Sequence, residues 1–372
     1  MTQRVFIIGA GVIAREHAAA SRKLSDITLF VADPSAEALE AFTALHPDAT
    51  AFHNADEMLA LAPEPDDIVV VAVPPWLHAP MTVKGFASGR HVLCEKPLGR
   101  DLAELDTMLQ AAHEAGKLLG DCSVRFLGQP QLVRAREILA SGQLGRIYHG
   151  ALINRRSRSR PGVEYQPTSK WFLHREKSGG GALLDWGVYD FTTLFDVIRP
   201  NKIEILNAWI AAPSTALDPE DVPFDVESHA GASMLVTLGD GTVFNLAYER
   251  GNGLHGQERD IMELDGTTAS IAWNWVGFQH DRVMSLTTHT DTEGRAVATT
   301  ERFELGTADA WNSMPLHSFV DLVQGRRSLA LSEERLRFNF ACIAALYEVA
   351  STGQPKTISV HQPACRPTNG LP

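Results

Sequence analysis

The sequence has few cysteines, no long apolar run and no excess of basic residues. Its 372 residues include four cysteines, at positions 94, 122, 342 and 365, which are widely scattered and lack the spacing of metal ligands. We therefore expect reduced thiols, no metal site and a cytoplasmic location. The longest apolar runs, such as Ile68–Val73, are too short to span a bilayer. The formal charge of −12 argues against nucleic acid or a membrane as a partner.

The composition is that of an ordinary globular protein, 44% hydrophobic and 21% charged, in a chain long enough for two domains. The apolar start, 5–14, is interrupted by glycines, which favours a strand–turn–helix unit over a secretory leader. Alternating strands and helices then predict a doubly wound parallel sheet for a first domain, residues 1–122. The predicted strands are 5–8, 28–31, 68–73, 91–95 and 118–122, and the helices are 13–24, 35–45, 57–61, 80–88 and 102–115.

The pattern changes after residue 123, where longer strands joined by glycine turns predict a second domain with a large, mostly antiparallel sheet. The predicted strands are 147–155, 203–211, 228–237, 242–249, 259–264, 269–272 and 282–288, and the helices are 130–141, 182–195, 310–324 and 333–351. This domain covers 123–360, and 361–372 is expected to be a loose tail. An open sheet face needs covering, so we expect a homodimer or homotetramer.

A glycine motif directly follows the first predicted strand and opens the first helix. In GAGVIA, 9–14, Gly9 provides a tight turn, Gly11 allows a close approach to a pyrophosphate, and the amides of Val12 and Ile13 face the phosphates. The alternative is a purely structural glycine turn. Because the motif lies within a strand–turn–helix, we interpret it as a dinucleotide site.

An acid ends the second predicted strand, as such sites require. Asp33 can accept hydrogen bonds from an adenosine ribose, and its charge would repel a 2′-phosphate. No arginine or lysine lies between 34 and 45 to neutralise that phosphate, so the sequence favours NAD over NADP. The alternative role for Asp33 is capping the next helix beside Ser35.

Two further strand ends point to the same edge of the sheet. VAVPPWLHAP, 71–80, ends the third predicted strand, and we expect Pro74 and His78 along the cofactor path, although His78 also fits a structural role. CEKP, 94–97, ends the next strand and places Glu95 and Lys96 at the ligand edge. The alternative for Lys96 is a surface ion pair with Glu95.

The stretch GGGALLDWGVYDF, 179–191, has three glycines before an expected helix. The flexible backbone suits a tight turn, which we expect to lie against the cofactor pocket. A spacing of four residues brings Asp185 and Tyr189 onto one helix face. The alternative for this stretch is a buried helix with a satisfied polar pair.

At Glu95-Lys96-Pro97 the chain resembles the glucose–fructose oxidoreductase / inositol dehydrogenase family (Gfo/Idh/MocA). The resemblance extends over nearly the whole chain, through the glycine motif, 73–105, 124–147, the glycine triple and 319–332. It implies a Rossmann domain, a second domain with an open antiparallel sheet, and hydride transfer between nicotinamide and a carbinol carbon of a sugar or polyol.

The family's catalytic residues map onto Lys96, Asp185 and Tyr189. The last position is most often histidine in the family. The tyrosine found here is similar to the residue that the glucose–fructose oxidoreductase and dihydrodiol dehydrogenase branches carry at this position. We expect Tyr189 to exchange the proton, Lys96 to lower its pKa and polarise the carbinol oxygen, and Asp185 to orient substrate. The alternative for Tyr189 is a core aromatic whose hydroxyl is satisfied.

The basic loop 154–172 lies near the substrate side in this family. Trp171 is expected to stack on a sugar ring, with a hydrophobic plug between the domains as the alternative. Arg155 is a candidate to bind an acidic group of the substrate, although a loop of charged residues that faces solvent fits the sequence as well. Arg125, just after the last Rossmann strand, is expected either to reach the cofactor or to hold the domain junction.

Three functions remain open from the sequence. The leading one is an NAD(P)-dependent oxidoreductase acting on a sugar-like alcohol. A glycoside hydrolase that uses NAD for transient oxidation shares the scaffold. A nicotinamide-binding regulator would need only the nucleotide end, so the joint presence of Lys96, Asp185 and Tyr189 argues against it.

Overall fold

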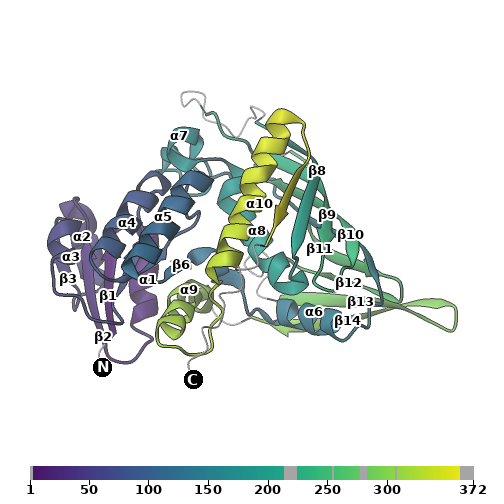
Figure 1. Cartoon of the computed structure of the whole chain (residues 1–372), viewed down its shortest axis with the longest axis horizontal. Helices are drawn as coiled ribbons and strands as arrows, with labels where there is room; N and C mark the ends of the chain where they lie inside the picture. The colour runs from purple at the N-terminus through teal and green to yellow at the C-terminus, as the bar shows by residue number, and fades with distance from the viewer. Residues whose placement is uncertain (1–2, 213–223, 254, 277–282, 306–307, 361–372) are drawn as a thin grey trace, which may run out of the picture.

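The structure, a computed structural model, describes residues 3–212, 224–253, 255–276, 283–305 and 308–360. It contains a six-stranded sheet from the N-terminal part and a nine-stranded sheet from the C-terminal part. Helices α8 and α10 lie between the two sheets (Figure 1). Within these ranges, every helix is too short or too polar to cross a membrane. The predicted tail, 361–372, lies outside the described residues.

The first sheet is parallel throughout, in the order β3-β2-β1-β4-β5-β6. In β4 (Ile68–Val71), Val69 and Val71 enter one apolar core and Ile68 and Val70 enter another, so both faces of the sheet are covered. The other strands are β1 (Gln3–Ile8), β2 (Ile27–Ala32), β3 (Thr50–Phe52), β5 (His91–Cys94) and β6 (Leu119–Asp121). The helices are α1 (Val12–Ser21), α2 (Ala36–Leu45), α3 (Ala55–Leu59), η1 (Pro75–Leu77), α4 (His78–Ala87) and α5 (Leu102–Ala115).

The second sheet has the order β14-β13-β12-β11-β7-β10-β9-β8-β15. Its pairings are antiparallel except that β7 and β10 run parallel. The strands are β7 (Ile147–Arg155), β8 (Lys202–Ala211), β9 (His229–Thr237), β10 (Val243–Gly251), β11 (Arg259–Gly266), β12 (Ala269–Trp273), β13 (Val283–Thr292), β14 (Arg295–Glu304) and β15 (Lys356–Ser359). The helices of this part are η2 (Cys122–Phe126), α6 (Pro130–Ala140), η3 (Lys170–Leu173), α7 (Arg175–Ser178), α8 (Ala182–Ile198), α9 (Ala308–Val323) and α10 (Glu333–Thr352).

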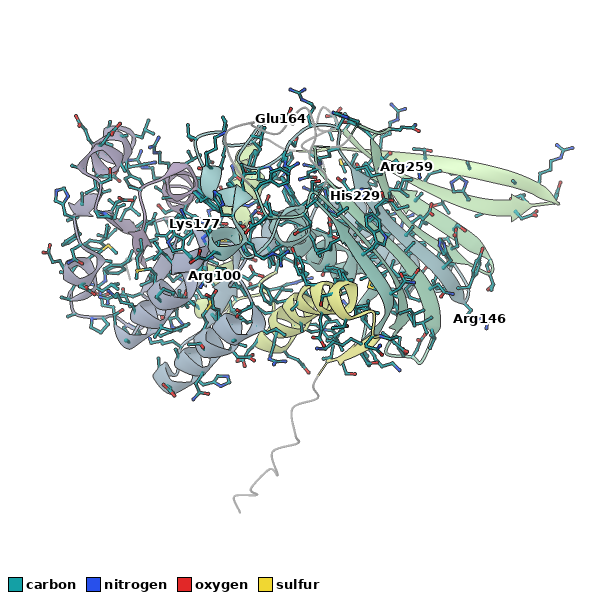
Figure 2. All side chains as sticks on the ribbon, turned by 90° about the horizontal axis from the view of Figure 1, so that it is seen from above. Arg100, Arg146, Glu164, Lys177, His229 and Arg259 are labelled. Atoms are coloured by element: carbon teal, nitrogen blue, oxygen red, sulfur yellow. The ribbon has the colours of Figure 1, made fainter. Side chains whose placement is uncertain are left out.

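One face of the nine-stranded sheet is covered by helices and the other is open. Helix α8 is buried along its length apart from Asp196, because it lies between this sheet and the rest of the protein. On the open face, Trp209 is 43% exposed. The hairpin of β13 and β14 projects from the body of the molecule (Figures 1 and 2).

Helix α9 is far from the first sheet in sequence but packs against it. Leu316, Phe319 and Val320 join the same apolar core as β1 and β2. The contact is close, since a Cβ atom on Gly120 of β6 would lie 2.5 Å from the Phe319 ring. The core of the N-terminal part is therefore completed by a segment from the C-terminal part.

The structure confirms the predicted fold class and corrects some elements. The sequence analysis missed β3, so the predicted third strand is the fourth in chain order. It also missed β14 and β15. Strand β3 has only three residues, and most of β14 is exposed, so neither shows the alternation of apolar residues on which a strand prediction depends.

Candidate active site

The glycine motif forms a tight turn between β1 and α1. Gly9 has φ +104°, and a Cβ atom there would lie 2.5 Å from the Ala72 carbonyl oxygen at the end of β4. Gly11 is different, because a Cβ atom there would meet no described atom within 4 Å. Gly11, Val12 and Ile13 line a cavity of about 550 Å³. The turn is therefore closed on the protein side and open on the cavity side.

Asp33 connects this turn to the end of β2. Its Oδ2 accepts a hydrogen bond from the Ala10 amide at 2.8 Å, and its Oδ1 accepts one from the Ser35 amide at 2.8 Å. The N-cap of α2 is Ser35, whose hydroxyl oxygen accepts from the Ala38 amide. Asp33 therefore fixes the glycine turn and is not the cap of this helix.

The ends of β4 and β5 form the next part of the cavity wall, where Pro74, His78, Glu95 and Lys96 all lie. The two ring nitrogens of His78 lie 2.7 Å from the Val73 carbonyl oxygen and 2.6 Å from the Pro97 carbonyl oxygen. Burial lowers the pKa of His78. Its ring therefore holds the two strand ends together at the cavity.

Lys96, Asp185 and Tyr189 come together in the same cavity. The Lys96 ammonium donates to Asp185 Oδ1 at 2.5 Å and to the Asp185 carbonyl oxygen at 3.0 Å. It also lies 5.1 Å from the centre of the Tyr189 ring. The side-chain partner of Lys96 is thus Asp185, and the alternative of an ion pair with Glu95 is wrong.

The second oxygen of the Asp185 carboxylate is available for a ligand. Oδ2 is buried and has no hydrogen-bond partner among the described residues. A buried, unpartnered carboxylate oxygen is costly unless something else donates to it. Because Asp185 lines the cavity, a hydroxyl group of a bound molecule can supply that donor.

Arg125 connects Tyr189 to the cofactor side of the cavity. Its Nε donates to the Tyr189 hydroxyl oxygen at 3.3 Å, Nη2 to Glu95 Oε1 at 2.6 Å, and Nη1 to Asn312 Oδ1 at 2.7 Å. Glu95 Oε1 also lies 2.8 Å from His17 Nε2. Arg125 therefore lines the cavity and links residues of the two parts of the chain, whereas its contact with the cofactor stays a prediction.

The protonation of this network differs from the expectation in one respect. Burial raises the pKa of Tyr189 to about 12, although Arg125 and Lys96 act in the opposite direction. The expected lowering by Lys96 is therefore outweighed, and Tyr189 is a neutral phenol at pH 7. Burial alone would lower the pKa of Lys96, but Asp185 raises it above its ordinary value. Burial would likewise raise the pKa of Glu95, but Arg125 and His17 hold it far below its ordinary range.

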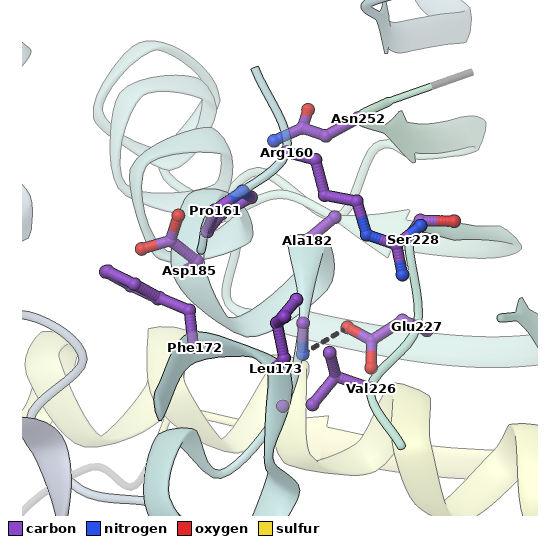
Figure 3. Close-up of a pocket in the computed structure, with 12 residues that line it drawn as sticks. Arg160, Pro161, Phe172, Leu173, Ala182, Asp185, Val226, Glu227, Ser228 and Asn252 are labelled. Carbon is purple, nitrogen blue, oxygen red and sulfur yellow. Dashed lines mark hydrogen bonds between the residues drawn. The ribbon is translucent and has the colours of Figure 1, made fainter. Parts of the chain in front are cut away.

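The glycine triple has a different role from the expected one. A Cβ atom on Gly181 would lie 1.8 Å from the Glu227 carbonyl oxygen, and one on Gly180 would lie 2.2 Å from the Tyr347 hydroxyl. Glu227 Oε1 accepts hydrogen bonds from the Gly181 and Leu183 amides at 2.9 and 3.0 Å, and Figure 3 shows the first of these. The glycines therefore let Glu227 reach the N-terminus of α8, where a carboxylate is favourable. They set the position of Asp185 and Tyr189 through this contact and not by turning against the cofactor pocket.

The two predicted substrate residues of the basic loop lie in different places. Trp171 lines the cavity, stacks on Phe172 at a centroid distance of 3.8 Å, and meets the edge of Trp76 at 5.7 Å. It therefore also bridges the two parts of the chain. Arg155 does not line this cavity, and its Nε lies 3.3 Å from Glu249 Oε1. Arg155 is thus paired with a carboxylate on the neighbouring strand β10, and its role toward the substrate stays a prediction.

The sequence analysis missed several side chains of the cavity wall. Those with a chemical signal nearby are Trp186, beside Asp185, and Phe172, beside Trp171. The others are Glu16, Phe126, Tyr165, Gln166, Ser169, Trp311 and Asn312. Trp311 and Asn312 come from α9, so only the packing of that helix brings them to the site.

Two groups of potential metal-binding side chains occur among the described residues, namely His17, Glu95 and Cys122, and His149, Glu263 and Asp265. In the first, Glu95 Oε1 already pairs with the Arg125 guanidinium, which opposes a cation at that oxygen. In the second, His149 pairs with Asp265 on the adjacent strand at 2.9 Å. The described cysteines Cys94, Cys122 and Cys342 are buried free thiols.

Comparison with protein families matches residues 3–121 to the GFO_IDH_MocA model, described as an oxidoreductase family with an NAD-binding Rossmann fold, and residues 132–272 to the GFO/IDH/MocA C-terminal domain. The chain is 33% identical over 208 residues to a putative UDP-kanosamine synthase oxidoreductase subunit of Amycolatopsis mediterranei, covering 54% of this chain and 53% of that protein. It spans about half the length of the first curated relatives it matches.

Other similarities cover nearly the whole chain. A D-glucoside 3-dehydrogenase of Escherichia coli is 26% identical over 370 residues, covering 94% of this chain and 96% of that protein. A solved levoglucosan dehydrogenase in complex with NADH and levoglucosan has a TM-score of 0.75 at 19% identity, covering 97% of this chain and 100% of that structure. At that identity the structural match establishes the fold.

Proposed function

Because this chain belongs to the GFO/IDH/MocA oxidoreductase family, we propose that it transfers a hydride between NAD and a carbinol or carbonyl carbon of a sugar, polyol or related cyclic alcohol. One observation carries this proposal. Lys96 from the first sheet meets Asp185 and Tyr189 from α8 in the same cavity that Gly11 opens into. A nucleotide site and a set of proton-exchanging side chains are thus continuous.

The residues of the glycine turn fit a dinucleotide. Gly11 leaves open space at the N-terminus of α1, where backbone amides face the cavity, as a pyrophosphate requires. The Asp33 carboxylate lies at the end of β2, and each of its oxygens retains a lone pair for a ribose hydroxyl. No basic residue lies between 34 and 45, so we propose NAD in preference to NADP. When bound, the nicotinamide supplies the hydride acceptor or donor.

The proton chemistry is assigned to Tyr189. Its oxygen accepts a hydrogen bond from Arg125 Nε, so the phenol hydrogen points elsewhere and is free to be donated into the cavity. The raised pKa of Tyr189, about 12, keeps this hydrogen in place at neutral pH. Tyr189 is therefore ready to protonate a carbonyl oxygen during reduction, which leaves it as a phenolate. In the direction of oxidation it accepts the hydroxyl proton of the substrate only from this phenolate form, after its own proton has been released.

Lys96 and Asp185 orient the reacting carbon. The ammonium donates to the carbinol or carbonyl oxygen and stabilises negative charge that develops there. Asp185 Oδ2 accepts a hydrogen bond from a neighbouring substrate hydroxyl, which fixes the ring relative to Tyr189. The ion pair between Lys96 and Asp185 holds both side chains in position before substrate binds.

The Tyr189→Phe variant tests this assignment. It removes one hydroxyl group and keeps the ring contact with Phe126, whose centroid lies 4.8 Å away. We expect kcat to fall about 10²–10⁴-fold while NAD affinity, measured by calorimetry, stays unchanged. Unchanged turnover would remove Tyr189 from the mechanism. Glycoside cleavage without net NADH release would instead favour the NAD-using glycoside hydrolase.

We also propose that the open sheet face is covered by a second copy of the chain, giving a homodimer or homotetramer. On this face Trp209 lies over Gly231, where a Cβ atom would be 2.6 Å from its ring, and packs 4.7 Å from His229. Sedimentation of a 40.6 kDa particle at micromolar concentration would contradict the proposal.

The proposed domain boundary, 122/123, falls where β6 ends and η2 begins. A cytoplasmic location is proposed from the reduced thiols.

A further inference from the structure

The substrate side of the cavity has an aromatic wall, formed by Tyr165, Trp171, Phe172 and Trp186, all of which line it. Tyr165 lies 6.4 Å from Phe172 and 6.3 Å from Trp186 between ring centroids. Figure 3 shows the Phe172 ring beside the Asp185 carboxylate. Tyr165 is tilted by 55° to both of these rings, so the rings form an uneven apolar surface next to the carboxylate that is expected to hold a substrate hydroxyl. The face of one such ring suits the C–H face of a sugar ring.

The charges that line this cavity are already paired. Among the described lining residues the cations are Lys96 and Arg125, and the carboxylates are Glu16, Glu95 and Asp185. Lys96 pairs with Asp185 at 2.5 Å, and Arg125 pairs with Glu95 at 2.6 Å. Carboxylates thus outnumber cations in the part of the wall that the structure describes. A further anion near Tyr189 would find no cation that is not already committed.

The basic loop does not supply the missing positive charge. None of the four arginines at 155, 156, 158 and 160 lines this cavity. Arg155 pairs with Glu249, Arg158 pairs with Glu164, and the Arg160 guanidinium lies over the Phe224 ring at 4.4 Å. The Arg156 guanidinium lies 4.4 Å from the centre of the Trp186 ring, which is part of the aromatic wall, and Arg160 lines a smaller adjoining pocket. These four guanidinium groups thus contact other residues, and none of them lines the cavity itself.

From this juxtaposition we infer that, given the proposed function, the substrate is an uncharged pyranose or pyranoside and that sugar acids, sugar phosphates and nucleotide sugars are excluded. Placing an anion in a partly buried site without a free cation costs desolvation energy that no ion pair returns. A neutral ring loses only weakly held water and gains contact with the aromatic wall. The exclusion of charged sugars thus follows from the lack of an uncommitted cation among the described residues of the wall.

The first experiment compares neutral sugars with anionic relatives of the same ring. Methyl α-glucoside, methyl α-galactoside and methyl α-mannoside are each assayed beside the corresponding uronic acid, with glucose 6-phosphate and UDP-glucose added, using NAD and NADH absorbance. Binding of each compound to the NAD-loaded protein is measured by calorimetry. We expect kcat/KM for each neutral sugar to exceed that for its anionic counterpart at least 100-fold. Equal or tighter binding of the anionic member of a pair would overturn the inference.

The second experiment adds the missing cation. Ser169 lines the cavity, and its side chain does not cap the following turn, so Ser169→Lys places an ammonium in the wall without removing a cap. Thr168→Lys is the matched control, because Thr168 is exposed, adjacent in sequence and outside the wall. We expect Ser169→Lys to improve binding of the anionic sugars about tenfold relative to wild type and Thr168→Lys to leave it unchanged. The same change in both variants, or in neither, would contradict a local charge effect.

The third experiment tests the aromatic wall. Phe172→Ala is expected to raise KM for the neutral sugars at least tenfold with little change in kcat, and Phe172→Tyr to keep KM near that of wild type. These outcomes are distinct from failure of the proposed function. If NAD binds but no pyranoside, neutral or anionic, is bound or turned over, then the proposed function itself is wrong. If anionic sugars are turned over as well as neutral ones, only the charge inference fails.

Discussion

The two sides of the cavity differ in how the chain builds them. The cofactor side comes from the segments after β1, β4 and β5, and several of its residues, such as Gly11, Pro74 and Lys96, follow a strand within three positions. The substrate side comes from the β7–α8 connection, from α8 itself and from α9, which are far apart in sequence. Parallel strands bring their ends to one edge by topology alone, whereas the substrate side depends on how separate helices pack.

This difference explains which residues the sequence could predict. Gly9, Gly11, Asp33 and Lys96 belong to local motifs whose spacing is set by one strand and one turn. The spacing of Asp185 and Tyr189 is likewise fixed by one helix. Trp311, by contrast, carries no local signal.

Two contacts cannot be predicted from the sequence for the same reason. Arg155 looks available in sequence, but its partner Glu249 lies on β10, a strand that pairs with β7 only in the folded sheet. The glycine triple was placed against the cofactor because its true neighbours, Glu227 and Tyr347, are distant in sequence. Even the pKa of Tyr189 follows from burial, which the residue pattern does not reveal. Residues within one local motif can thus be predicted from the sequence, whereas contacts between distant segments depend on how the chain packs.

The largest expected effect is at the residue that joins the two sides. Lys96→Met keeps the length of the side chain but removes the ammonium that pairs with Asp185. We expect kcat to fall about 10³-fold, because the charge that stabilises the substrate oxygen is lost. Stopped-flow or steady-state measurement of NADH checks this, with NAD affinity as the control. A fall confined to NAD affinity would assign Lys96 to the cofactor side alone.

A smaller effect is expected at Glu95, whose carboxylate pairs with Arg125 and His17. Glu95→Gln leaves a buried guanidinium without its partner and should lower the free energy of unfolding by about 3 kcal/mol at pH 7. Because the pKa of Glu95 is lowered in the folded protein, its ionised carboxylate contributes to the free energy of unfolding fully above pH ~4.3, the ordinary pKa of a glutamate. This contribution is lost as the pH falls further. Urea midpoints of both proteins from pH 7 to pH 3 should therefore converge, and parallel curves would contradict the assignment.

Gly9 and Gly11 give a sharper comparison within the cofactor side. Gly9→Ala forces a Cβ atom against the Ala72 carbonyl oxygen at a positive φ, so it should destabilise the fold by about 1–3 kcal/mol. Gly11→Ala meets open space and should leave stability unchanged while weakening NAD about tenfold. Thermal unfolding and NAD titration separate the two. Equal loss of stability in both variants would mean that the turn is purely structural.

The smallest effect is expected at Arg155, which lies outside the cavity. Arg155→Ala removes a partly exposed ion pair with Glu249 and should change stability by less than about 1 kcal/mol. Turnover with neutral sugars should stay within twofold of wild type. A large rise in KM would show that Arg155 contributes to substrate binding, and the substrate side would then extend beyond the residues that line the cavity.

The packing of α9 on the first sheet has a consequence for how the protein is made. During synthesis the six parallel strands leave the ribosome long before Leu316, Phe319 and Val320, which complete their core. Until then, the apolar surface around Gly120 is exposed to solvent in the nascent chain. The core of the N-terminal part is thus complete only after α9 has been synthesised, and we expect a chain interrupted before residue 308 to expose this apolar surface and to aggregate.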